Sequence, residues 1–327
     1  MSDQHPYIGV SDIVFPNLDL ARSVLARIGA EVHMASGSTP EAILQVAREA
    51  DGLLVTYAKI TADMIREMKK CKVISRFGIG VDNVDLAAAT EAGIVVTKVP
   101  DYCIDEVSDH AMALLLAAAR KIPFSNTRVQ GGQWQMKSVV PIHRLRGSVV
   151  GLVGFGRIPQ LVAPKAKAFG FRVVAFDPYI PADVFAKAGV ESVSLDELLK
   201  ISDYVSVHTP LLPETNRLFR AETFQKMKRG AYLVNTARGP IIDEADLARA
   251  LDAGQLAGAA LDVMTQEPPT GSPLLGRDNV IITPHTSFYS EESLNDLETK
   301  AAEEVVRVLS KQAPRNPVNP EVLKRSA

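Results

Sequence analysis

The stretch 149–163, VVGLVGFGRIPQLVA, decides the fold class of this 327-residue chain. An apolar run rich in β-branched residues predicts a strand, two nearby glycines predict a tight turn, and the segment after them predicts a helix. In such a unit Gly154 and Gly156 let the backbone pass close to a pyrophosphate, while the helix N-terminus and the charge of Arg157 favour an anion. The stretch therefore predicts a dinucleotide-binding turn.

The three-glycine pattern GxGxxG is incomplete here, because Pro159 stands where the third glycine is expected. A proline in the first helical turn costs no hydrogen bond, since the N–H groups there are unpaired anyway. We expect the turn to be kept and the packing of the helix to shift. The glycines alone also fit a plain strand–helix turn, so the cofactor prediction depends on a second residue.

That second residue is Asp177, which lies 21 residues after Gly156 at the end of the next apolar strand, RVVAFDPY. A carboxylate at this position accepts hydrogen bonds from both ribose hydroxyls and repels a 2′-phosphate. The sequence therefore predicts NAD rather than NADP as the cofactor.

Strands and helices alternate in both directions from this unit. Toward the C-terminus the pattern predicts six strands, at 149–153, 172–176, 204–208, 231–235, 258–262 and 280–283, with helices at 158–169, 194–201 and 244–253. Toward the N-terminus it predicts strands at 7–15, 31–35, 52–57, 73–77 and 94–99, with helices at 18–28, 40–50, 61–70 and 86–92. Parallel strands need crossover connections, which are usually helices. We predict an α/β fold with two doubly wound parallel-sheet domains.

Two further helices set the expected domain boundaries. One covers 104–121 and is followed by a loop at 130–146, and the other is a long amphipathic helix at 291–311, followed by a tail rich in proline and asparagine. We assign residues 1–100 plus 290–327 to one domain and residues 101–289 to the other. A chain of this length usually exceeds what one hydrophobic core supports.

Composition and charge exclude several classes of function. Apolar residues make up 46% of the chain and charged residues 23%, which is typical of a globular enzyme. The formal net charge is −2, and the Lys and Arg residues are spread out, so we expect no nucleic-acid partner. The longest apolar run, 111–119, is too short to cross a bilayer, so we expect no membrane partner.

The cysteines and the N-terminus bear on metal binding and location. Two cysteines, Cys71 and Cys103, are too few for a disulfide framework or a zinc cage, and we expect no bound metal. The N-terminus lacks the basic and then apolar layout of a signal peptide. We therefore expect a cytoplasmic protein.

Three residues with catalytic chemistry follow predicted strands of the C-terminal sheet. Arg238 lies in NTARG, Glu267 in DVMTQEPP and His285 in ITPHTSF. Open α/β sheets bind ligands at the carboxyl ends of their strands, so we expect the three side chains at one edge. Taken singly, each has a plainer interpretation: a surface cation, a solvated loop acid, and a helix cap or core histidine.

Motifs along nearly the whole chain together resemble the D-isomer-specific 2-hydroxyacid dehydrogenases, the family of D-lactate, D-3-phosphoglycerate, glyoxylate/hydroxypyruvate and formate dehydrogenases. The motifs are RFGIGVDNVD at 76–85, GFGRI at 154–158, FDPY at 176–179, HTPLLPET at 208–215, NTARG at 235–239, ALDVMTQEP at 260–268 and TPHTSF at 283–288. The resemblance implies a flavodoxin-like substrate-binding domain at 1–100 plus 290–327. It also implies a Rossmann NAD-binding domain at 101–289.

The resemblance gives the three catalytic candidates their roles. Arg238 would hold the carboxylate and carbonyl oxygen of the substrate with its planar fork. His285 would be the acid/base, and Glu267 would hydrogen-bond the imidazole and favour its protonated form. The implied reaction transfers a hydride between NAD and a 2-oxo or D-2-hydroxy carboxylic acid.

The resemblance also implies further contacts to cofactor and substrate. Asp262 resembles the aspartate at the nicotinamide carboxamide, and the amides of Gly78, Ile79 and Gly80 would face the substrate carboxylate. Tyr57, with Ala58 and Lys59, would line the substrate pocket, although Lys59 equally fits a solvated loop cation. The implied cofactor residues are Gly154, Gly156, Arg157, Ile158, Asp177, His208, Thr209, Pro210, Thr236, Ala237, Arg238, Asp262 and His285. The implied substrate residues are Tyr57, Gly78, Ile79, Arg238 and His285.

The segment VPDYCIDEVSDHAMALLL at 99–116 resembles the branch of the family that contains the C-terminal binding protein corepressors. This branch raises an alternative, an NAD(H)-sensing binding protein with vestigial catalysis. A purely structural α/β interaction protein is disfavoured by Asp177 and the catalytic candidates. Phe288 stands where that branch often carries a tryptophan against the substrate, which leaves the substrate open. In the resembling family the helix at 104–121 and the loop after it form the dimer interface, which predicts a homodimer.

Overall fold

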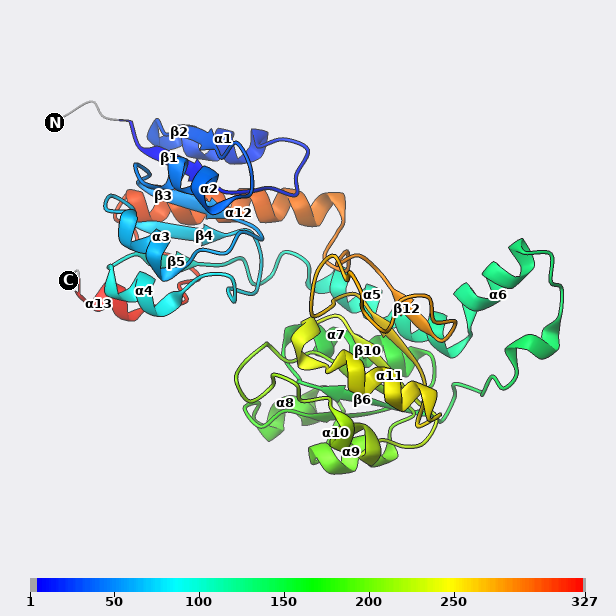
Figure 1. Ribbon diagram of the computed structural model, residues 1–327. Helices are drawn as coiled ribbons and strands as arrows, with labels where there is room; N and C mark the ends of the chain where they lie inside the picture. The colour runs from blue at the N-terminus through cyan, green and yellow to red at the C-terminus, as the bar shows by residue number, and fades with distance from the viewer. Residues whose placement is uncertain (1–4, 326–327) are drawn as a thin grey trace. The chain divides into compact units, whose positions relative to one another are not determined.

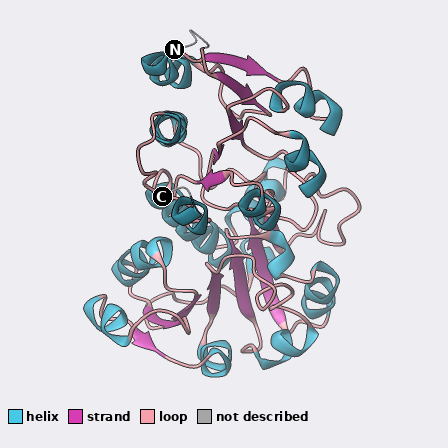
Figure 2. Ribbon diagram, turned by 90° about the vertical axis from the view of Figure 1, so that its left-hand side faces the viewer, coloured by secondary structure: helices cyan, strands magenta, loops and turns pink. Residues whose placement is uncertain are grey.

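The computed structural model describes residues 5–325 of the chain. The chain divides into two compact units. The first unit comprises the residues up to Tyr102 together with those from Ser290 onward, and the second unit comprises Cys103–Tyr289. Each unit contains a parallel β-sheet covered by helices (Figure 1, Figure 2). The predicted α/β class with two doubly wound parallel sheets is confirmed.

The first unit is built on a five-stranded sheet with the order β2-β1-β3-β4-β5, in which every pairing is parallel. This is the flavodoxin-like strand order. The strands are β1 (Tyr7–Val10), β2 (Glu31–Met34), β3 (Gly52–Val55), β4 (Val73–Arg76) and β5 (Val95–Thr97). The helices are α1 (Asp19–Leu25), η1 (Ala26–Ile28), α2 (Pro40–Ala47), α3 (Ala62–Glu67), α4 (Leu86–Glu91), α12 (Glu291–Leu309) and α13 (Glu321–Arg325).

Strand β1 is shorter than the sequence predicts, because it ends at Val10 rather than at residue 15. The N–H of Ser11 still donates to the carbonyl oxygen of Leu54. Beyond it, the carboxylate of Asp12 accepts hydrogen bonds from backbone amides that follow β3, which turns the chain into a loop. The apolar residues after Asp12 therefore belong to a loop and not to the strand.

Helix α12 completes the first unit, although it follows the second unit in the sequence. It packs against α1 and against strands β3, β4 and β5. The buried face includes Leu294, Leu297, Ala301 and Val305, at the helical spacing that the sequence predicts. Helix α13 was not predicted, because the tail before it is rich in proline.

The second unit is built on a seven-stranded parallel sheet with the order β12-β11-β10-β9-β6-β7-β8. The strands are β6 (Val149–Val153), β7 (Arg172–Phe176), β8 (Glu191–Ser192), β9 (Tyr204–Val207), β10 (Ala231–Asn235), β11 (Leu256–Leu261) and β12 (Val280–Ile282). The six predicted strands are present. The prediction of only six was wrong, because β8 is a two-residue, exposed edge strand that shows no apolar pattern.

Helices cover both faces of the second sheet, with separate hydrophobic clusters beneath α5, α7 and α8 and beneath α9, α10 and α11. These helices are α5 (Ile104–Ala119), α7 (Arg157–Ala168), α8 (Ala182–Lys187), α9 (Leu195–Ile201), α10 (Ala221–Lys226) and α11 (Glu244–Asp252). The sequence did not predict α8 and α10, which have six residues each and bury one phenylalanine each. The unit also contains α6 (Ile122–Gln130) and the short turns η2 (Met136–Val139) and η3 (Gly239–Ile241).

The predicted helix at 104–121 is wrong at its C-terminal end. Helix α5 stops at Ala119, because Lys121 adopts a left-handed conformation with φ of 52°. Helix α6 starts directly after it with Pro123 in its first turn, where proline removes no hydrogen bond. The expected loop at 130–146 contains the turn η2. None of the residues of α6 is buried, and the helix extends away from the sheet of its unit (Figure 1).

Proline occurs twice in α7, which follows the glycine turn. Pro159 is the third residue of the helix and is buried, as a residue of the first turn that needs no N–H. Pro164 lies inside the helix, where it leaves one carbonyl oxygen without its usual partner. The incomplete glycine pattern is therefore compatible with a strand–turn–helix unit.

No helix within residues 5–325 combines the length and the apolar character needed to cross a membrane. No group of three or more His, Cys, Asp and Glu side chains in that range is arranged to hold a metal ion.

Candidate active site

Neighbouring strands of the second sheet end in residues that the sequence singled out. All these strands are parallel, so their carboxyl ends lie at one edge of the sheet. From β12 across to β7, the residues just beyond the strand ends are His285, Asp262, Thr236, His208, Gly154 and Asp177. Strand β6 lies between β7 and β9, which makes this the point where the strand order reverses and where open α/β sheets bind ligands.

The turn after β6 requires glycine at its first position. Gly154 has φ of 93°, and a Cβ atom on it would lie 2.8 Å from the carbonyl oxygen of His208. Gly156 is the N-cap of α7, and a Cβ atom there would meet nothing within 4 Å. The turn is thus closed toward β9 and open at the N-terminus of α7. Exposed Arg157 is the first residue of that helix.

Asp177 binds the glycine turn in addition to ending β7. Its Oδ2 accepts the N–H of Phe155 at 2.9 Å, and its Oδ1 accepts the N–H of Tyr179 at 2.9 Å. A carboxylate oxygen has a second lone pair, and Asp177 is only half-buried. The side chain therefore keeps acceptor capacity for ribose hydroxyls while it holds the turn in place.

Two buried hydroxyl groups at this edge have no hydrogen-bond partner among the described residues, namely Oγ1 of Thr209 and Oγ1 of Thr236. Buried polar atoms are rarely left unpaired, and a polar ligand is one means of satisfying them. Burial lowers the pKa of His208 to about 3, so its ring is neutral at pH 7, with Nε2 2.9 Å from Oγ of Ser206. The edge combines an anion-binding helix end, unpaired hydroxyls and a neutral histidine, which together fit a dinucleotide.

His285 and Glu267 form a hydrogen-bonded pair, with Nδ1 of the imidazole 2.7 Å from Oε2 of the carboxylate. The other carboxylate oxygen accepts the N–H of Met264 at 3.0 Å. Burial raises the pKa of Glu267, but the hydrogen bond and charge of His285, the Met264 N–H and the charge of Arg238 together lower it by more. The net result is a Glu267 pKa below its usual value. Glu267 is therefore ionised at neutral pH, and its Oε2 can only accept the hydrogen bond that it shares with Nδ1 of His285.

The backbone of His285 adopts a conformation that few side chains tolerate. Its φ is 52°, in the left-handed region, and its N–H donates to the carbonyl oxygen of Asp262 at 2.9 Å. The ring of Phe288 meets the imidazole edge-on, with ring centroids 6.1 Å apart. The position of the imidazole therefore depends on how tightly this loop is held.

The carboxylate of Asp262 is fully buried and binds the loop that carries His285. Its Oδ1 accepts the hydroxyl of Thr283 at 2.6 Å and the N–H of Thr286 at 2.9 Å, and its Oδ2 accepts the N–H of Ser287 at 2.9 Å. In the structure this carboxylate organises residues 283–287. The contact of Asp262 with the cofactor stays a prediction.

Arg238 lies at the end of a turn that Asn235 shapes. The Oδ1 of Asn235 accepts the N–H of Ala237, and its Nδ2 donates to the carbonyl oxygen of Arg238, both at 2.9 Å. The guanidinium is half-buried, and its Nη1 donates to the carbonyl oxygen of Ala237 at 2.7 Å. Its charge also acts on Glu267, which brings the three catalytic candidates into one electrostatic group.

Comparison with known proteins settles which family this arrangement belongs to. Residues 112–287 match the family model described as D-isomer specific 2-hydroxyacid dehydrogenase, NAD binding domain. The chain belongs to the D-isomer-specific 2-hydroxyacid dehydrogenase family. The resemblance inferred from the motifs is confirmed, and the second unit contains the NAD-binding domain of this family.

Several relatives of this family member are similar to it over most of its length. D-3-phosphoglycerate dehydrogenase from Methanocaldococcus jannaschii is 43% identical over 301 residues, which cover 91% of this chain and 57% of that protein. The chain thus spans little more than half the length of the curated relatives it matches. Among solved structures, the TT0316 protein from Thermus thermophilus has a TM-score of 0.85 at 39% identity, covering 95% of this chain and 99% of that one. D-Lactate dehydrogenase from Aquifex aeolicus, complexed with NAD and lactic acid, has a TM-score of 0.86 at 28% identity, covering 95% and 98%.

The first unit of this 2-hydroxyacid dehydrogenase family member carries the remaining site candidates. Gly78 follows β4 with φ of 146°, and the guanidinium of Arg76 fills the place that a Cβ atom would occupy. Ile79 is half-buried, and Tyr57 is 48% exposed in the loop after β3. Lys59 in the same loop is exposed.

Two residues that the sequence did not single out hold the Tyr57 loop. Asp12 accepts the backbone N–H groups of Thr56 at 3.1 Å and Tyr57 at 2.6 Å. Asn83 donates from Nδ2 to the carbonyl oxygens of Thr56 and Ala58, at 3.1 and 2.9 Å. Asp12 was missed because the predicted strand at 7–15 ran through it. A correct strand end at Val10 would have placed it among the carboxyl-end residues.

Gly239, the last residue of the NTARG motif, is a further residue on which the site depends. A Cβ atom there would lie 2.0 Å from the carbonyl carbon and oxygen of Met264, which are backbone atoms. The N–H of the same Met264 binds Glu267. The turn that carries Arg238 and the loop that carries Glu267 therefore touch through a glycine.

We predict that Gly239→Ala lowers stability by about 1–3 kcal/mol, the usual range for added core volume, and that it lowers turnover as well. The methyl group must push the Met264 backbone away, and this backbone positions Glu267. Thermal and urea unfolding together with steady-state kinetics would measure both effects. Gly37→Ala is the matched control, because a Cβ atom there meets nothing within 4 Å and the residue has no positive φ. Equal stability of the two variants would contradict the prediction.

Proposed function

We propose that the protein is an NAD-dependent dehydrogenase that transfers a hydride between the nicotinamide and a 2-oxo or D-2-hydroxy carboxylic acid. The observation that carries the proposal is the hydrogen bond between His285 and ionised Glu267, in one electrostatic group with Arg238. This group lies at the same sheet edge as the glycine turn of an NAD-binding domain.

The proposed acid/base step uses the imidazole of His285. Bound NAD(H) would supply or accept the hydride. Ionised Glu267 only accepts, so Nδ1 of the ring is the donor in this hydrogen bond, and Nε2 is the nitrogen that donates a proton to the carbonyl oxygen of a 2-oxo acid. In the reverse direction the neutral ring accepts the hydroxyl proton at Nε2. Glu267 stays ionised throughout and stabilises the charge that the ring carries.

Substrate orientation is proposed to come from Arg238. The guanidinium is a planar fork that matches a carboxylate and reaches a neighbouring carbonyl oxygen. The substrate contacts of Gly78, Ile79 and Tyr57 stay predictions from the sequence. The curated relatives include D-3-phosphoglycerate dehydrogenases, and a solved neighbour is a D-lactate dehydrogenase, so 2-hydroxy acids of different size are all candidates.

The experiment that tests the proposal measures NADH oxidation with a panel of 2-oxo acids. Glyoxylate, pyruvate, hydroxypyruvate, phenylpyruvate and phosphohydroxypyruvate cover small, apolar and phosphorylated side chains. We expect turnover with at least one of them and preference for NADH over NADPH. Tight NADH binding without turnover of any acid would contradict the proposal and would favour the alternative of an NAD(H)-sensing protein.

The predicted NAD preference has its own test in Asp177. We predict that Asp177→Asn weakens NADH binding by roughly 10- to 100-fold, because a hydrogen bond to a charged group contributes more than a neutral one. We also predict that it raises the NADPH/NADH ratio of kcat/KM, because the charge that repels a 2′-phosphate is gone. Fluorescence titration and steady-state kinetics measure the two effects.

The matched control for Asp177 is Asp183→Asn on α8. Asp183 is an exposed acid whose partner is Lys187 one helical turn away, so its replacement changes the net charge by the same amount. An unchanged cofactor ratio in Asp177→Asn, or an equal change in the control, would overturn the assignment. The folded state of Asp177→Asn must be checked by circular dichroism, because Asp177 also binds the glycine turn.

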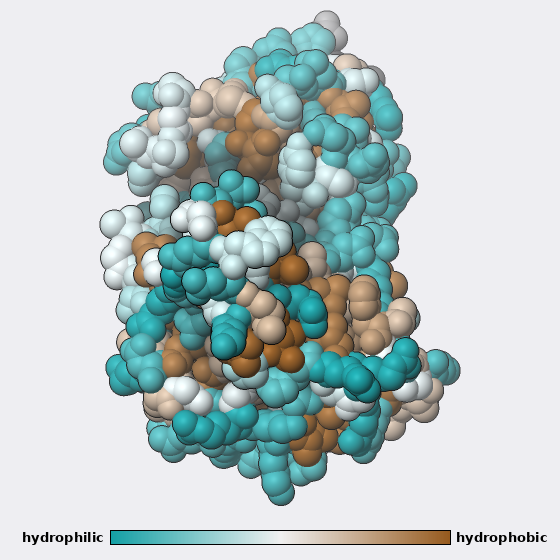
Figure 3. Space-filling view, turned by 90° about the vertical axis from the view of Figure 1, so that its right-hand side faces the viewer, coloured by the Kyte–Doolittle hydropathy of each residue, from teal (hydrophilic) through white to brown (hydrophobic). Residues whose placement is uncertain are grey.

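We also propose that the protein is a homodimer, with residues 122–140 at the interface; these residues comprise α6, η2 and the loop around η2 and are called the α6 segment. Several large apolar side chains of this segment are exposed: Ile122 (57%), Val129 (44%), Trp134 (87%), Met136 (76%) and Val140 (60%). Figure 3 shows apolar patches on the side of the second unit where α6 lies in Figure 1. Large apolar side chains that are exposed together in one segment often mark a protein–protein interface.

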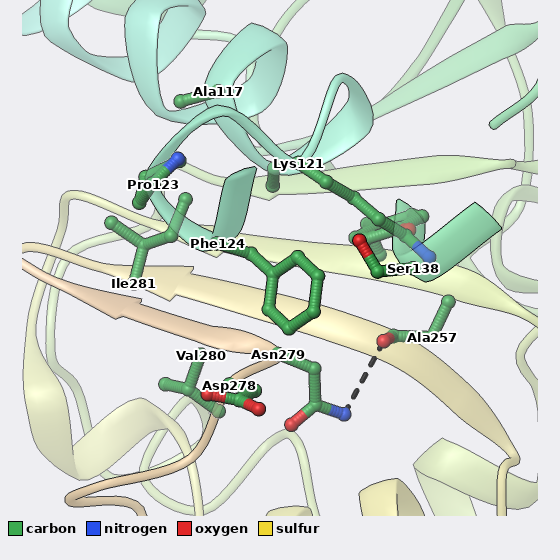
Figure 4. Close-up of a pocket in the computed structure, with 12 residues that line it drawn as sticks. Ala117, Lys121, Pro123, Phe124, Ser138, Ala257, Asp278, Asn279, Val280 and Ile281 are labelled. Carbon is green, nitrogen blue, oxygen red and sulfur yellow. Dashed lines mark hydrogen bonds between the residues drawn. The ribbon is translucent and has the colours of Figure 1, made fainter. Parts of the chain in front are cut away.

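A pocket at the base of α6 supports the same proposal. It has a volume of about 150 Å³ and is lined by residues at the ends of α5 and β11, in α6 and along β12. Phe124 projects toward the strands, and Asn279 is held by a 3.3 Å hydrogen bond to the carbonyl oxygen of Ala257 (Figure 4). A second copy of the chain would cover this pocket and the α6 segment together.

We predict that light scattering finds a dimer at micromolar concentration. Replacing both Trp134 and Met136 by alanine should shift the protein toward the monomer, whereas Lys137→Ala in the same segment should not. A monomeric wild-type protein would refute the dimer. A cytoplasmic location remains a prediction from the sequence.

A further inference from the structure

His110 on α5 contacts the loop that carries the proposed acid/base. Its Nε2 lies 3.0 Å from Oγ1 of Thr283 and 3.6 Å from Oδ1 of Asp262. The hydroxyl of Thr283 lies 2.6 Å from the same Oδ1. One histidine, one hydroxyl and one buried carboxylate thus form a connected group at this loop, and the sequence motifs had given His110 no role.

The direction of these hydrogen bonds follows from the chemistry of the groups. An ionised carboxylate accepts only, so the single proton of the Thr283 hydroxyl is donated to Asp262. The hydroxyl oxygen then has only lone pairs for His110, which makes the Nε2 of His110 the donor. The order of donation therefore runs from His110 to Thr283 to Asp262.

The same carboxylate fixes the backbone around His285. Asp262 accepts the N–H groups of Thr286 and Ser287, both at 2.9 Å, and its side chain has no exposed surface. The N–H of His285 donates to the carbonyl oxygen of Asp262 at 2.9 Å, and His285 keeps a left-handed φ of 52°. A backbone in that region persists only when its surroundings hold it firmly.

We propose that His110 is a positioning residue for His285, which it holds in place through Thr283 and Asp262. The proposal rests on the proposed function only for its kinetic consequences. Its structural consequence is that removing the Nε2–H donor loosens residues 283–287 and lets the imidazole leave its alignment with Glu267. Small displacements of an acid/base reduce the rate much more than they reduce ground-state binding.

The kinetic test compares His110→Leu with His110→Gln. Glutamine keeps an amide donor near the place of Nε2, and leucine removes it. We expect kcat to fall roughly 10-fold in His110→Leu, with the KM of the 2-oxo acid and the affinity for NADH changed less than about 2-fold, and we expect His110→Gln to restore most of the activity. Thr283→Val should lower kcat as well, and the double variant His110→Leu/Thr283→Val should lose less than the product of the two single effects, because both act through one connection.

Asp109→Asn is the control on the same helix. The side chain of Asp109 is 69% exposed and forms an ion pair with Lys165, which lies on α7 and not in the 283–287 loop. Unchanged kcat in His110→Leu, or an equal loss in Asp109→Asn, would overturn the proposal. A loss in His110→Gln as large as that in His110→Leu would also overturn it, since the donor would not matter.

A spectroscopic readout separates this proposal from the proposed function. The chain has six histidines, so the imidazole signals in a ¹H–¹⁵N spectrum can be assigned by single substitutions. We expect the signal of His285 to move in His110→Leu and to stay in place in His110→Gln and Asp109→Asn. An unmoved His285 signal in His110→Leu would refute the positioning role even in a protein without dehydrogenase activity, and a moved signal would support it in that case.

Discussion

Replacing His285 by asparagine is expected to lower kcat by about 10²- to 10⁴-fold with the best 2-oxo acid of the panel, the range typical of a general acid/base. The reason is that Nε2 of the imidazole would no longer deliver the proton to the carbonyl oxygen. Asparagine is the appropriate substitution because His285 has φ of 52°, a region that asparagine tolerates better than alanine or other residues with a Cβ. Steady-state rates of NADH oxidation, measured at saturating substrate, would give the loss.

The affinity for NADH shows whether the loss of kcat in His285→Asn comes from the missing proton donor or from weaker cofactor binding. NADH affinity, measured by fluorescence titration, is expected to change little in His285→Asn, because the glycine turn and Asp177 lie at other strand ends of the sheet. His143→Asn, an exposed histidine outside the described edge, serves as control. A loss below about 10-fold with intact cofactor binding would remove His285 from the acid/base role.

Replacing Arg238 is expected to lower kcat/KM by roughly 30- to 5,000-fold, since truncating one partner of a desolvated charge pair costs a few kcal/mol. The reason is the loss of the group that binds the substrate carboxylate and carbonyl oxygen together. Arg238→Lys should lose less than Arg238→Gln, because lysine keeps the charge and gives up only the planar fork. Kinetics with a 2-oxo acid and with its amide would show whether the charge of the substrate is what Arg238 binds.

The matched control for Arg238 is Arg220→Gln. Arg220 is exposed and pairs with Glu222, and exposed ion pairs contribute little. We expect wild-type kinetics from this variant. If Arg238→Gln kept the selectivity of the wild-type protein for the acid over its amide, the carboxylate-binding role of Arg238 would be wrong.

Much of the fold was predictable because apolar patterning and glycine turns are local signals. Strands β6, β7 and β10 end where the apolar runs end, and α12 buries the residues that the helical spacing selects. The errors occur where local signals are weak. Strand β8 is too short to show a pattern, and α6 has no buried face, so neither left a periodic trace in the sequence.

The residues of the candidate site also fall into two groups, those that the sequence could reveal and those that it could not. Residues placed directly after long apolar strands, such as Gly154, Asp177 and Asp262, could be found by position alone. Asp12, Asn83 and His110 could not, because their partners lie 25 or more residues away in the sequence. Gly239 stood in a recognised motif, but only its contact with the Met264 backbone shows why a side chain is excluded there.

The sequence by itself determined the α/β class, the parallel sheets, the NAD-type fingerprint and the identity of the catalytic candidates. These properties depend on residue type, strand periodicity and the rule that parallel strands align their carboxyl ends. Only the tertiary structure decided that Glu267 binds His285, that Asp177 also holds the glycine turn, and that the carboxylate of Asp262 faces the 283–287 loop. The physical reason is that hydrogen-bond partners are set by distances between separate strand ends, and such distances follow from packing across the sheet rather than from spacing along the chain.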